Sequence, residues 1–101
     1  MNLIIVIPCF NDNVHLKGLV KKIQSLYSLD ILIVDDGSVE PVCQYDLDDK
    51  VFIARNEANR GKGYSLKKAF NYAHDNNYTH AITIDADLQV PDTSKFKKNG
   101  Q

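Results

Sequence analysis

Leu3-Ile4-Ile5-Val6-Ile7 is the stretch that decides the fold of this 101-residue chain. Every position in it is apolar and most are β-branched, whereas a strand with one wet face would alternate apolar and polar residues. We therefore predict a strand that is buried on both faces. Strands of this kind belong to parallel sheets that helices cover on both sides.

Three further segments are predicted to be strands, and two helices are predicted to connect them. The strands span 31–34, 51–54 and 79–84. Apolar residues recur at helical spacing at Leu16, Leu19, Val20, Ile23 and Leu26, and again at Leu66, Ala69, Phe70 and Ala73. The segment 39–50 is polar, and we expect a loop or a short helix there. This order predicts an α/β fold with a four-stranded, mostly parallel sheet flanked by helices.

Composition excludes several classes of function. Hydrophobic residues make up 44% of the chain and charged residues 25%, which is ordinary for a folded domain. A net charge of −1 gives no overall attraction to nucleic acid. The first apolar run lacks a basic flank and stops at Pro8, so we expect no signal peptide and a cytoplasmic location. Cys9 and Cys43 are too few for a disulfide framework.

Acidic, turn-forming residues follow three of the predicted strands. They are Pro8 to Asp12, Asp35-Asp36-Gly37-Ser38, and Asp85-Ala86-Asp87. Parallel strands have their carboxyl ends at one edge of the sheet, and ligands of open α/β sheets bind at that edge. We therefore expect these three loops to converge on one binding site.

The segment from Asp85 to Gln89 predicts a metal site. Alternate residues of an extended chain face the same side, so Asp85 and Asp87 would point together and Gln89 could join them. Oxygen ligands of this kind suit Mg²⁺ or Mn²⁺ bound to phosphate. A cation would also keep two neighbouring carboxylates ionised. The alternative is that Asp85 and Asp87 only cap a turn. Turn capping would explain a single aspartate well, but it explains a pair at this spacing less well.

Two other segments could contact a nucleotide. Asp35 and Asp36 could accept hydrogen bonds from a base or a sugar, and Gly37 permits a positive φ, although a plain Asp-Gly turn explains this pattern equally well. In 59–63, two glycines surround Lys62 where a helix begins, and helix starts attract anions. The alternative there is a solvated glycine-rich loop. Phe10 could stack on a nucleobase.

Taken in order, the motifs at 7–12, 34–38, 59–63 and 84–89 resemble the nucleotide-binding half of family 2 inverting glycosyltransferases. The last two look most similar to the polyprenyl-phosphate (dolichyl-phosphate) sugar transferase branch. The resemblance implies a truncated, Rossmann-like N-terminal half of the GT-A fold. It implies a nucleotide-sugar-binding domain over 1–92, followed by a polar tail or the start of an acceptor half over 93–101.

The resemblance also implies roles for the matched residues. The residues that would bind the nucleotide-sugar are Pro8, Phe10, Asp12, Asp35, Asp36, Arg60, Lys62, Asp85 and Asp87. The metal ligands would be Asp85, Asp87 and Gln89. The donor would be a UDP- or GDP-linked sugar, the acceptor a polyprenyl phosphate or a glycan, and the cofactor divalent Mg or Mn. Asp12 departs from the family, which usually has Glu at this position.

The acceptor half of such enzymes carries the catalytic base, and this sequence ends at Gln101. We therefore expect no catalytic residue within the chain, with the base beyond Gln101, and donor binding with little or no turnover by the chain alone. A full-length parent could associate with a membrane. The face toward the missing half would be apolar, and a homodimer through that face is a hypothesis.

Three other functions fit parts of the pattern. A non-catalytic nucleotide-binding module is the main alternative to an enzyme. A phosphatase of the D-x-D-x-T kind requires Thr where Gln89 stands. A receiver domain has its acidic pair after the first strand, whereas Asp35 and Asp36 follow the second. The sequence therefore disfavours the last two.

Overall fold

The computed structural model of the chain describes residues 2–43 and 50–86. Its elements in order are β1 (Leu3–Cys9), α1 (Asn13–Leu26), β2 (Asp30–Asp36), β3 (Val51–Asn56), α2 (Lys62–Asp75) and β4 (His80–Thr83). The four strands form one sheet in the order β3-β2-β1-β4, and every neighbouring pair is parallel. The predicted α/β fold with a parallel four-stranded sheet is confirmed.

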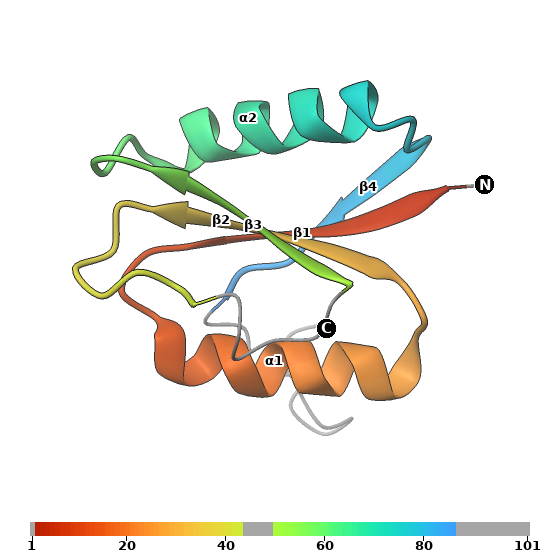
Figure 1. Cartoon of the computed structure of the whole chain (residues 1–101), viewed down its shortest axis with the longest axis horizontal. Helices are drawn as coiled ribbons and strands as arrows, with labels where there is room; N and C mark the ends of the chain where they lie inside the picture. The colour runs from red at the N-terminus through yellow and green to blue at the C-terminus, as the bar shows by residue number, and fades with distance from the viewer. Residues whose placement is uncertain (1, 44–49, 87–101) are drawn as a thin grey trace, which may run out of the picture.

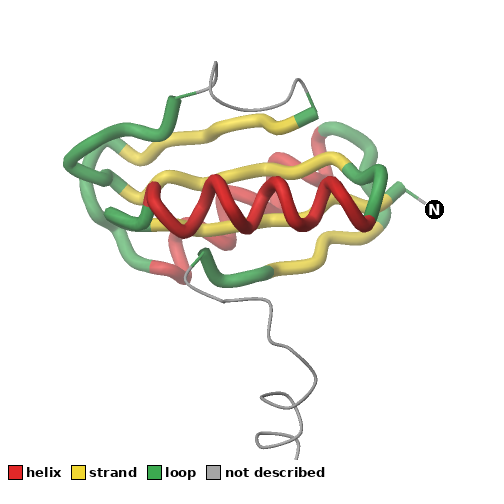
Figure 2. Tube along the Cα trace, turned by 90° about the horizontal axis from the view of Figure 1, so that it is seen from below, coloured by secondary structure: helices red, strands yellow, loops and turns green. Residues whose placement is uncertain are grey.

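The two helices cover opposite faces of the sheet, with α2 on one side and α1 on the other (Figure 1). Figure 2 shows the four strands side by side behind α1. On β1, Ile5 and Ile7 pack in the α1 layer, while Ile4 and Val6 pack in the α2 layer. Successive residues point to opposite faces, so a strand covered on both sides must be apolar at each position. This explains why residues 3–7 are all apolar.

The α2 layer differs from the prediction in which residues face the sheet. Phe70, predicted on the core face, is 46% exposed. The predicted Ala69 and Ala73 are buried, and Ser65 is buried with them, so that the buried residues of α2 follow one another at intervals of four. Small side chains along this row let the helix approach the strands closely, and Phe70 lies outside the contact.

The fourth strand is confirmed at His80–Thr83, but it is largely exposed, whereas its apolar residues are typical of a buried strand. Ile82 is 47% exposed. Within the described part of the chain β4 pairs with β1 alone, so one side of it has no neighbouring strand. Residues 39–43 form neither helix nor strand, while 44–49 and the predicted tail 93–101 lie outside the described residues.

The strand order determines where a ligand could enter. From β1 the chain adds β2 and β3 on one side, and it then crosses to add β4 on the other. A reversal of this kind leaves a crevice at the carboxyl ends of the strands on either side of it, here β1 and β4. Neither helix in the described segments is long and apolar enough to cross a bilayer.

Candidate functional site

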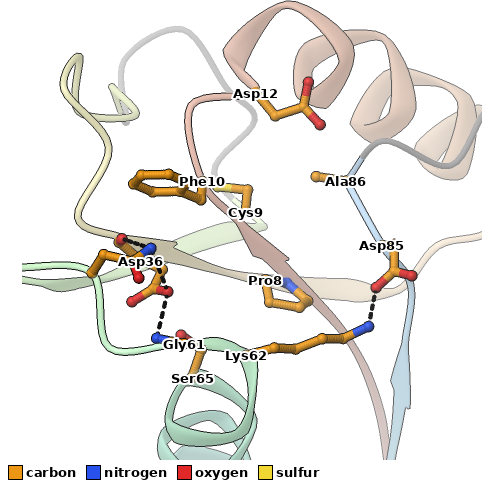
Figure 3. A pocket seen from close by; sticks show the side chains of 11 residues that line it. Pro8, Cys9, Phe10, Asp12, Asp36, Gly61, Lys62, Ser65, Asp85 and Ala86 are labelled. Carbon is orange, nitrogen blue, oxygen red and sulfur yellow. Dashed lines mark hydrogen bonds and ion pairs between the residues drawn. The ribbon is translucent and has the colours of Figure 1, made fainter.

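A pocket of about 430 Å³ lies at the carboxyl edge of the sheet, where the loops after β1, β2 and β4 meet the start of α2 (Figure 3). Of the predicted site residues, those that line it are Pro8, Phe10, Asp12, Asp36, Lys62 and Asp85. Asp35 and Arg60 do not line it. Asp87 and Gln89 lie outside the described residues. Residues from all three predicted loops therefore meet at one place.

The loop after β1 is tied to the loop after β2. The Asn11 N–H donates to Ser38 Oγ at 2.8 Å, and Asn11 Oδ1 accepts from the Val39 N–H at 2.8 Å. Asn11 has a φ of 54°, in the left-handed region that asparagine tolerates better than most residues. These bonds fix the segment that carries Phe10, whose side chain stays 48% exposed at the pocket.

Asp12 occupies the N-cap position of α1, but its side chain makes no capping hydrogen bond. Its Oδ1 instead contacts Nδ1 of His15, three residues along the helix, at 2.5 Å. Figure 3 shows the Asp12 carboxylate at the side of the pocket that α1 forms. The carboxylate is therefore held by a partner on the helix while it lines the pocket.

Asp36 is the most firmly anchored carboxylate of the pocket, and it is only 6% exposed. Its Oδ1 accepts from Asn56 Nδ2 at 2.8 Å and from the Arg60 N–H at 2.7 Å. Its Oδ2 accepts from Asn59 Nδ2 at 3.1 Å and from the Gly61 N–H at 2.9 Å. A carboxylate has about four acceptor sites, so these bonds use its capacity. Asp36 thereby binds the whole segment that leads into α2.

The hydrogen bonds also decide the charge of Asp36. Burial alone would raise the pKa of its carboxyl, since a buried charge is poorly solvated. Donors from the Arg60 backbone, the Asn56 side chain and the Gly61 backbone outweigh burial and lower the pKa below its usual range. Asp36 is therefore an anion whose stabilisation depends on the position of the 56–61 segment.

Gly37 allows that segment to approach β2. Its φ is +76°, and a Cβ added there would lie 2.6 Å from the carbonyl carbon of Ala58 and 2.6 Å from the nitrogen of Asn59. Both the backbone conformation and the contact exclude a side chain. The positive φ expected at Gly37 is confirmed, and close approach of a second backbone is a further reason for glycine.

Asp35 points away from the pocket, because neighbouring residues of a strand face opposite sides of the sheet. It is fully buried. Its Oδ1 accepts from the Ser38 N–H at 3.0 Å, and its Oδ2 accepts from the Val42 N–H at 3.1 Å and from Arg55 Nη1 at 2.7 Å. Burial would raise the pKa of Asp35, but these partners lower it. Asp35 thus closes the turn after β2.

Lys62 and Asp85 face each other across the pocket. Lys62 is the first residue of α2, Asp85 follows β4, and Nζ of the lysine lies 2.6 Å from Oδ1 of the aspartate (Figure 3). Their side chains are 59% and 55% exposed. Arg60, two residues before Lys62, places its guanidinium over the ring of Tyr64, 5.7 Å from the centroid. Lys62 is therefore the basic side chain that the glycine-rich loop contributes to this pocket.

Charge determines what the pocket can accept. Its described lining residues include the carboxylates of Asp12, Asp36 and Asp85 and one ammonium, that of Lys62, which gives a formal charge of −2. An anionic ligand entering here would be repelled by this charge unless a cation accompanied it. A diphosphate therefore requires a positive partner beyond Lys62.

Among the described residues, Asp85 is a suitable oxygen ligand for such a cation. Within 2–43 and 50–86, no group of three or more His, Cys, Asp and Glu side chains is placed to hold a metal. Asp85 is an exposed carboxylate at the pocket that already attracts a cation, the Lys62 ammonium. Mg²⁺ is commonly held by one or two carboxylates when phosphate oxygens and water complete its shell. Asp85 fits this requirement.

Asn56 contributes to the site although no sequence motif indicated it. Asn56 ends β3 and pairs in register with Asp36. Its Nδ2 donates both to Asp36 and to Ser65 Oγ, at 2.8 and 3.0 Å, and its Oδ1 accepts from Lys68 Nζ at 3.0 Å. The sequence showed only an asparagine shortly after the predicted strand 51–54, and its burial comes from the structure. Asn56 does not itself line the pocket; the lining residues not predicted as site residues are Cys9, Asn59, Gly61, Ser65 and Ala86.

Comparison with known proteins places these observations in context. The sequence pattern of glycosyl transferase family 2 matches residues 4–98. An uncharacterized protein of Methanocaldococcus jannaschii is 31% identical over 94 residues, which covers 86% of this chain and 41% of that protein. The chain therefore spans less than half the length of this curated relative.

Proposed function

The chain belongs to glycosyl transferase family 2, and on this premise we propose that its pocket binds the nucleotide of a UDP- or GDP-linked sugar. The observation that carries the proposal is the meeting of Phe10, Lys62 and Asp85 around one pocket at the carboxyl edge of the sheet. These side chains supply a ring, a cation and a carboxylate. A nucleoside diphosphate with a divalent ion needs one of each.

Phe10 is proposed to stack on the nucleobase. Its ring is 48% exposed, and the segment that carries it is fixed by the Asn11 bonds to the loop after β2. Stacking between a base and an aromatic ring contributes about 1–3 kcal/mol. Asp12 and Pro8 line the same pocket, and Asp12 could accept a hydrogen bond from a ribose hydroxyl. The nucleoside would then lie between the β1 loop and the segment held by Asp36.

The diphosphate is proposed to lie near the start of α2. Lys62 offers an ammonium there, and the first N–H groups of a helix have no partners within it. Asp85 would hold a divalent Mg or Mn ion, with Asp87 and Gln89 as the other predicted ligands. Such an ion would offset the negative charge that develops on the departing nucleoside diphosphate. The Lys62 ammonium would stabilise the same negative charge from the opposite wall of the pocket.

Asp35, Asp36 and Arg60 are proposed to shape the pocket rather than to hold the donor. The carboxylates of both aspartates are already occupied by donors of this chain. A base N–H could reach Asp36 only by displacing one of them. Arg60 contributes through its backbone N–H, which donates to Asp36 at 2.7 Å.

The proposed reaction is inverting transfer of the sugar to a polyprenyl phosphate or a glycan. The acceptor hydroxyl or phosphate must attack the anomeric carbon, and a hydroxyl acceptor needs a base to take its proton. Donor binding is the activity proposed for residues 1–92. A cytoplasmic location, membrane association of a longer parent and a homodimer are further parts of the proposal.

Calorimetric titration of the chain with UDP- and GDP-linked sugars, with and without Mn²⁺, tests the proposal. We expect one nucleotide class to bind in the presence of the metal. Its affinity for Phe10→Ala should be about tenfold or more lower, because stacking on the ring is lost. Phe70→Ala is the matched control, since Phe70 is similarly exposed but lies on α2 away from the pocket. Absence of binding to every nucleotide would refute the proposal, and binding that ignores the metal would favour a non-catalytic nucleotide-binding module.

A further inference from the structure

The ion pair between Lys62 and Asp85 joins two walls of the pocket that are distant in sequence. Lys62 begins α2, and Asp85 lies beyond β4, 23 residues later. Figure 3 shows the lysine side chain extended along the pocket to reach the carboxylate. In this arrangement the ammonium and the carboxylate neutralise each other. Lys62 would have to release Asp85 to bind an anion, and Asp85 would have to release Lys62 to bind a cation.

The pair is easily exchanged. Both side chains are more than half exposed, at 59% and 55%, and exposed ion pairs contribute only about 0–1 kcal/mol. The contact at 2.6 Å places the ammonium directly on Oδ1 of Asp85. A second cation at this carboxylate would be repelled by the ammonium at so short a distance. Asp85 therefore cannot serve Lys62 and a divalent ion together without cost.

We propose that Asp85 exchanges Lys62 for a divalent cation when the donor binds, and that the released Lys62 turns to the diphosphate. This inference rests on the proposed function and adds a coupling between two ligands of the same pocket. Either ligand alone must break the ion pair and leaves one of the two groups without a partner. Both together give each group a new one. Metal and diphosphate therefore assist each other, and this coupling is reciprocal.

Other residues of the pocket do not share this property. The Asp36 carboxylate is buried and saturated by four donors. Asp12 is held by His15 on its own helix. Among the described lining residues, Asp85 is the carboxylate whose partner is a cation from the opposite wall. The exchange is thus assigned to one pair and can be tested with one substitution.

The test measures Mn²⁺ affinity by electron paramagnetic resonance, with the metal alone and then with UDP or GDP. We expect Lys62→Met to bind Mn²⁺ alone about fivefold more tightly than the natural protein, because the competing ammonium is gone. The nucleotide should raise Mn²⁺ affinity strongly in the natural protein and much less in Lys62→Met. Lys67→Met, an exposed position of α2 outside the pocket, should behave like the natural protein in both measurements.

The outcomes separate this inference from the proposed function. Unchanged or weaker Mn²⁺ binding by Lys62→Met overturns the exchange, even where nucleotide binding is intact. Absence of Mn²⁺ binding in all variants overturns it as well. Nucleotide failure alone refutes the proposed function and leaves the metal-only comparison decisive for the exchange. Lys62→Gln repeats the test with a polar side chain, and circular dichroism checks that each variant folds.

Discussion

Replacing Asp36 by asparagine should destabilise the fold strongly while preserving the shape of the side chain. One oxygen becomes an NH₂ group, which cannot accept a hydrogen bond. In either orientation two donors lose their acceptor: Asn56 and the Arg60 N–H, or Asn59 and the Gly61 N–H. Hydrogen bonds to a charged group contribute about 1.5–3 kcal/mol each. With partial relaxation of the loop we expect a loss of about 3 kcal/mol in the free energy of unfolding.

The loss should depend on pH in a defined direction. The pKa of Asp36 is lowered in the folded protein. Its contribution to stability is therefore present above the pKa of the unfolded chain, about 3.9, and is lost as the pH falls through the lower folded value. The natural protein and Asp36→Asn should consequently differ most near neutral pH and begin to converge below about pH 4.

Urea unfolding followed by circular dichroism at pH 7 and pH 3 provides the measurement. Asp75→Asn is the control, because the Asp75 side chain is 76% exposed at the far end of α2. A second readout is amide exchange at Arg60 and Gly61, whose N–H groups would lose protection. A cost below about 0.5 kcal/mol at pH 7, within the range of ordinary surface changes, would show that Asp36 does not organise the loop. An equal cost at both pH values would contradict the charge argument.

Two further predictions follow from the same region. Gly37→Ala should cost more than about 2 kcal/mol in urea unfolding, because a positive φ is unfavourable for alanine and the added Cβ would meet the Ala58–Asn59 backbone at 2.6 Å. Gly18→Ala, where a Cβ meets nothing within 4 Å on α1, should be neutral or stabilising, and equal effects of both would contradict the steric account. Burial, followed by the charges of Asp35, Asp12 and Asp36, raises the pKa of Cys9 to about 12, so iodoacetamide at pH 8 should modify Cys43 and leave Cys9 unmodified until the protein is unfolded. Mass spectrometry of the folded protein checks this, and early labelling of Cys9 would speak against its burial.

The fold was predictable because its signals are local. A continuous apolar run such as residues 3–7 indicates a strand that is covered on both faces. The helical spacing of apolar residues locates α1 between two such strands. The convergence of the loops after β1, β2 and β4 followed from parallel pairing alone. The alternation of faces could also have separated Asp35 from Asp36, since it needs only the knowledge that both end one strand.

The remaining features depend on distances between elements, which a single sequence does not state. Asn56 meets Asp36 because β3 pairs with β2 in one particular register. Ser65 is buried and Phe70 is exposed because α2 packs on the sheet through its row of small residues. Lys62 reaches Asp85 only once α2 is packed on β1 and β2 and β4 is paired with β1.

The bonds around Asn11 and Asp36 also bear on the entropy of association. The segments that would contact a nucleoside are already ordered by hydrogen bonds within the chain. Little conformational entropy of these segments would therefore be lost when a ligand binds. The wall that carries Asp85 meets α2 through a weak, solvated contact. The nucleoside would then enter a preformed part of the pocket. Selection among sugars would depend on the wall that carries Asp85, which can adjust more easily.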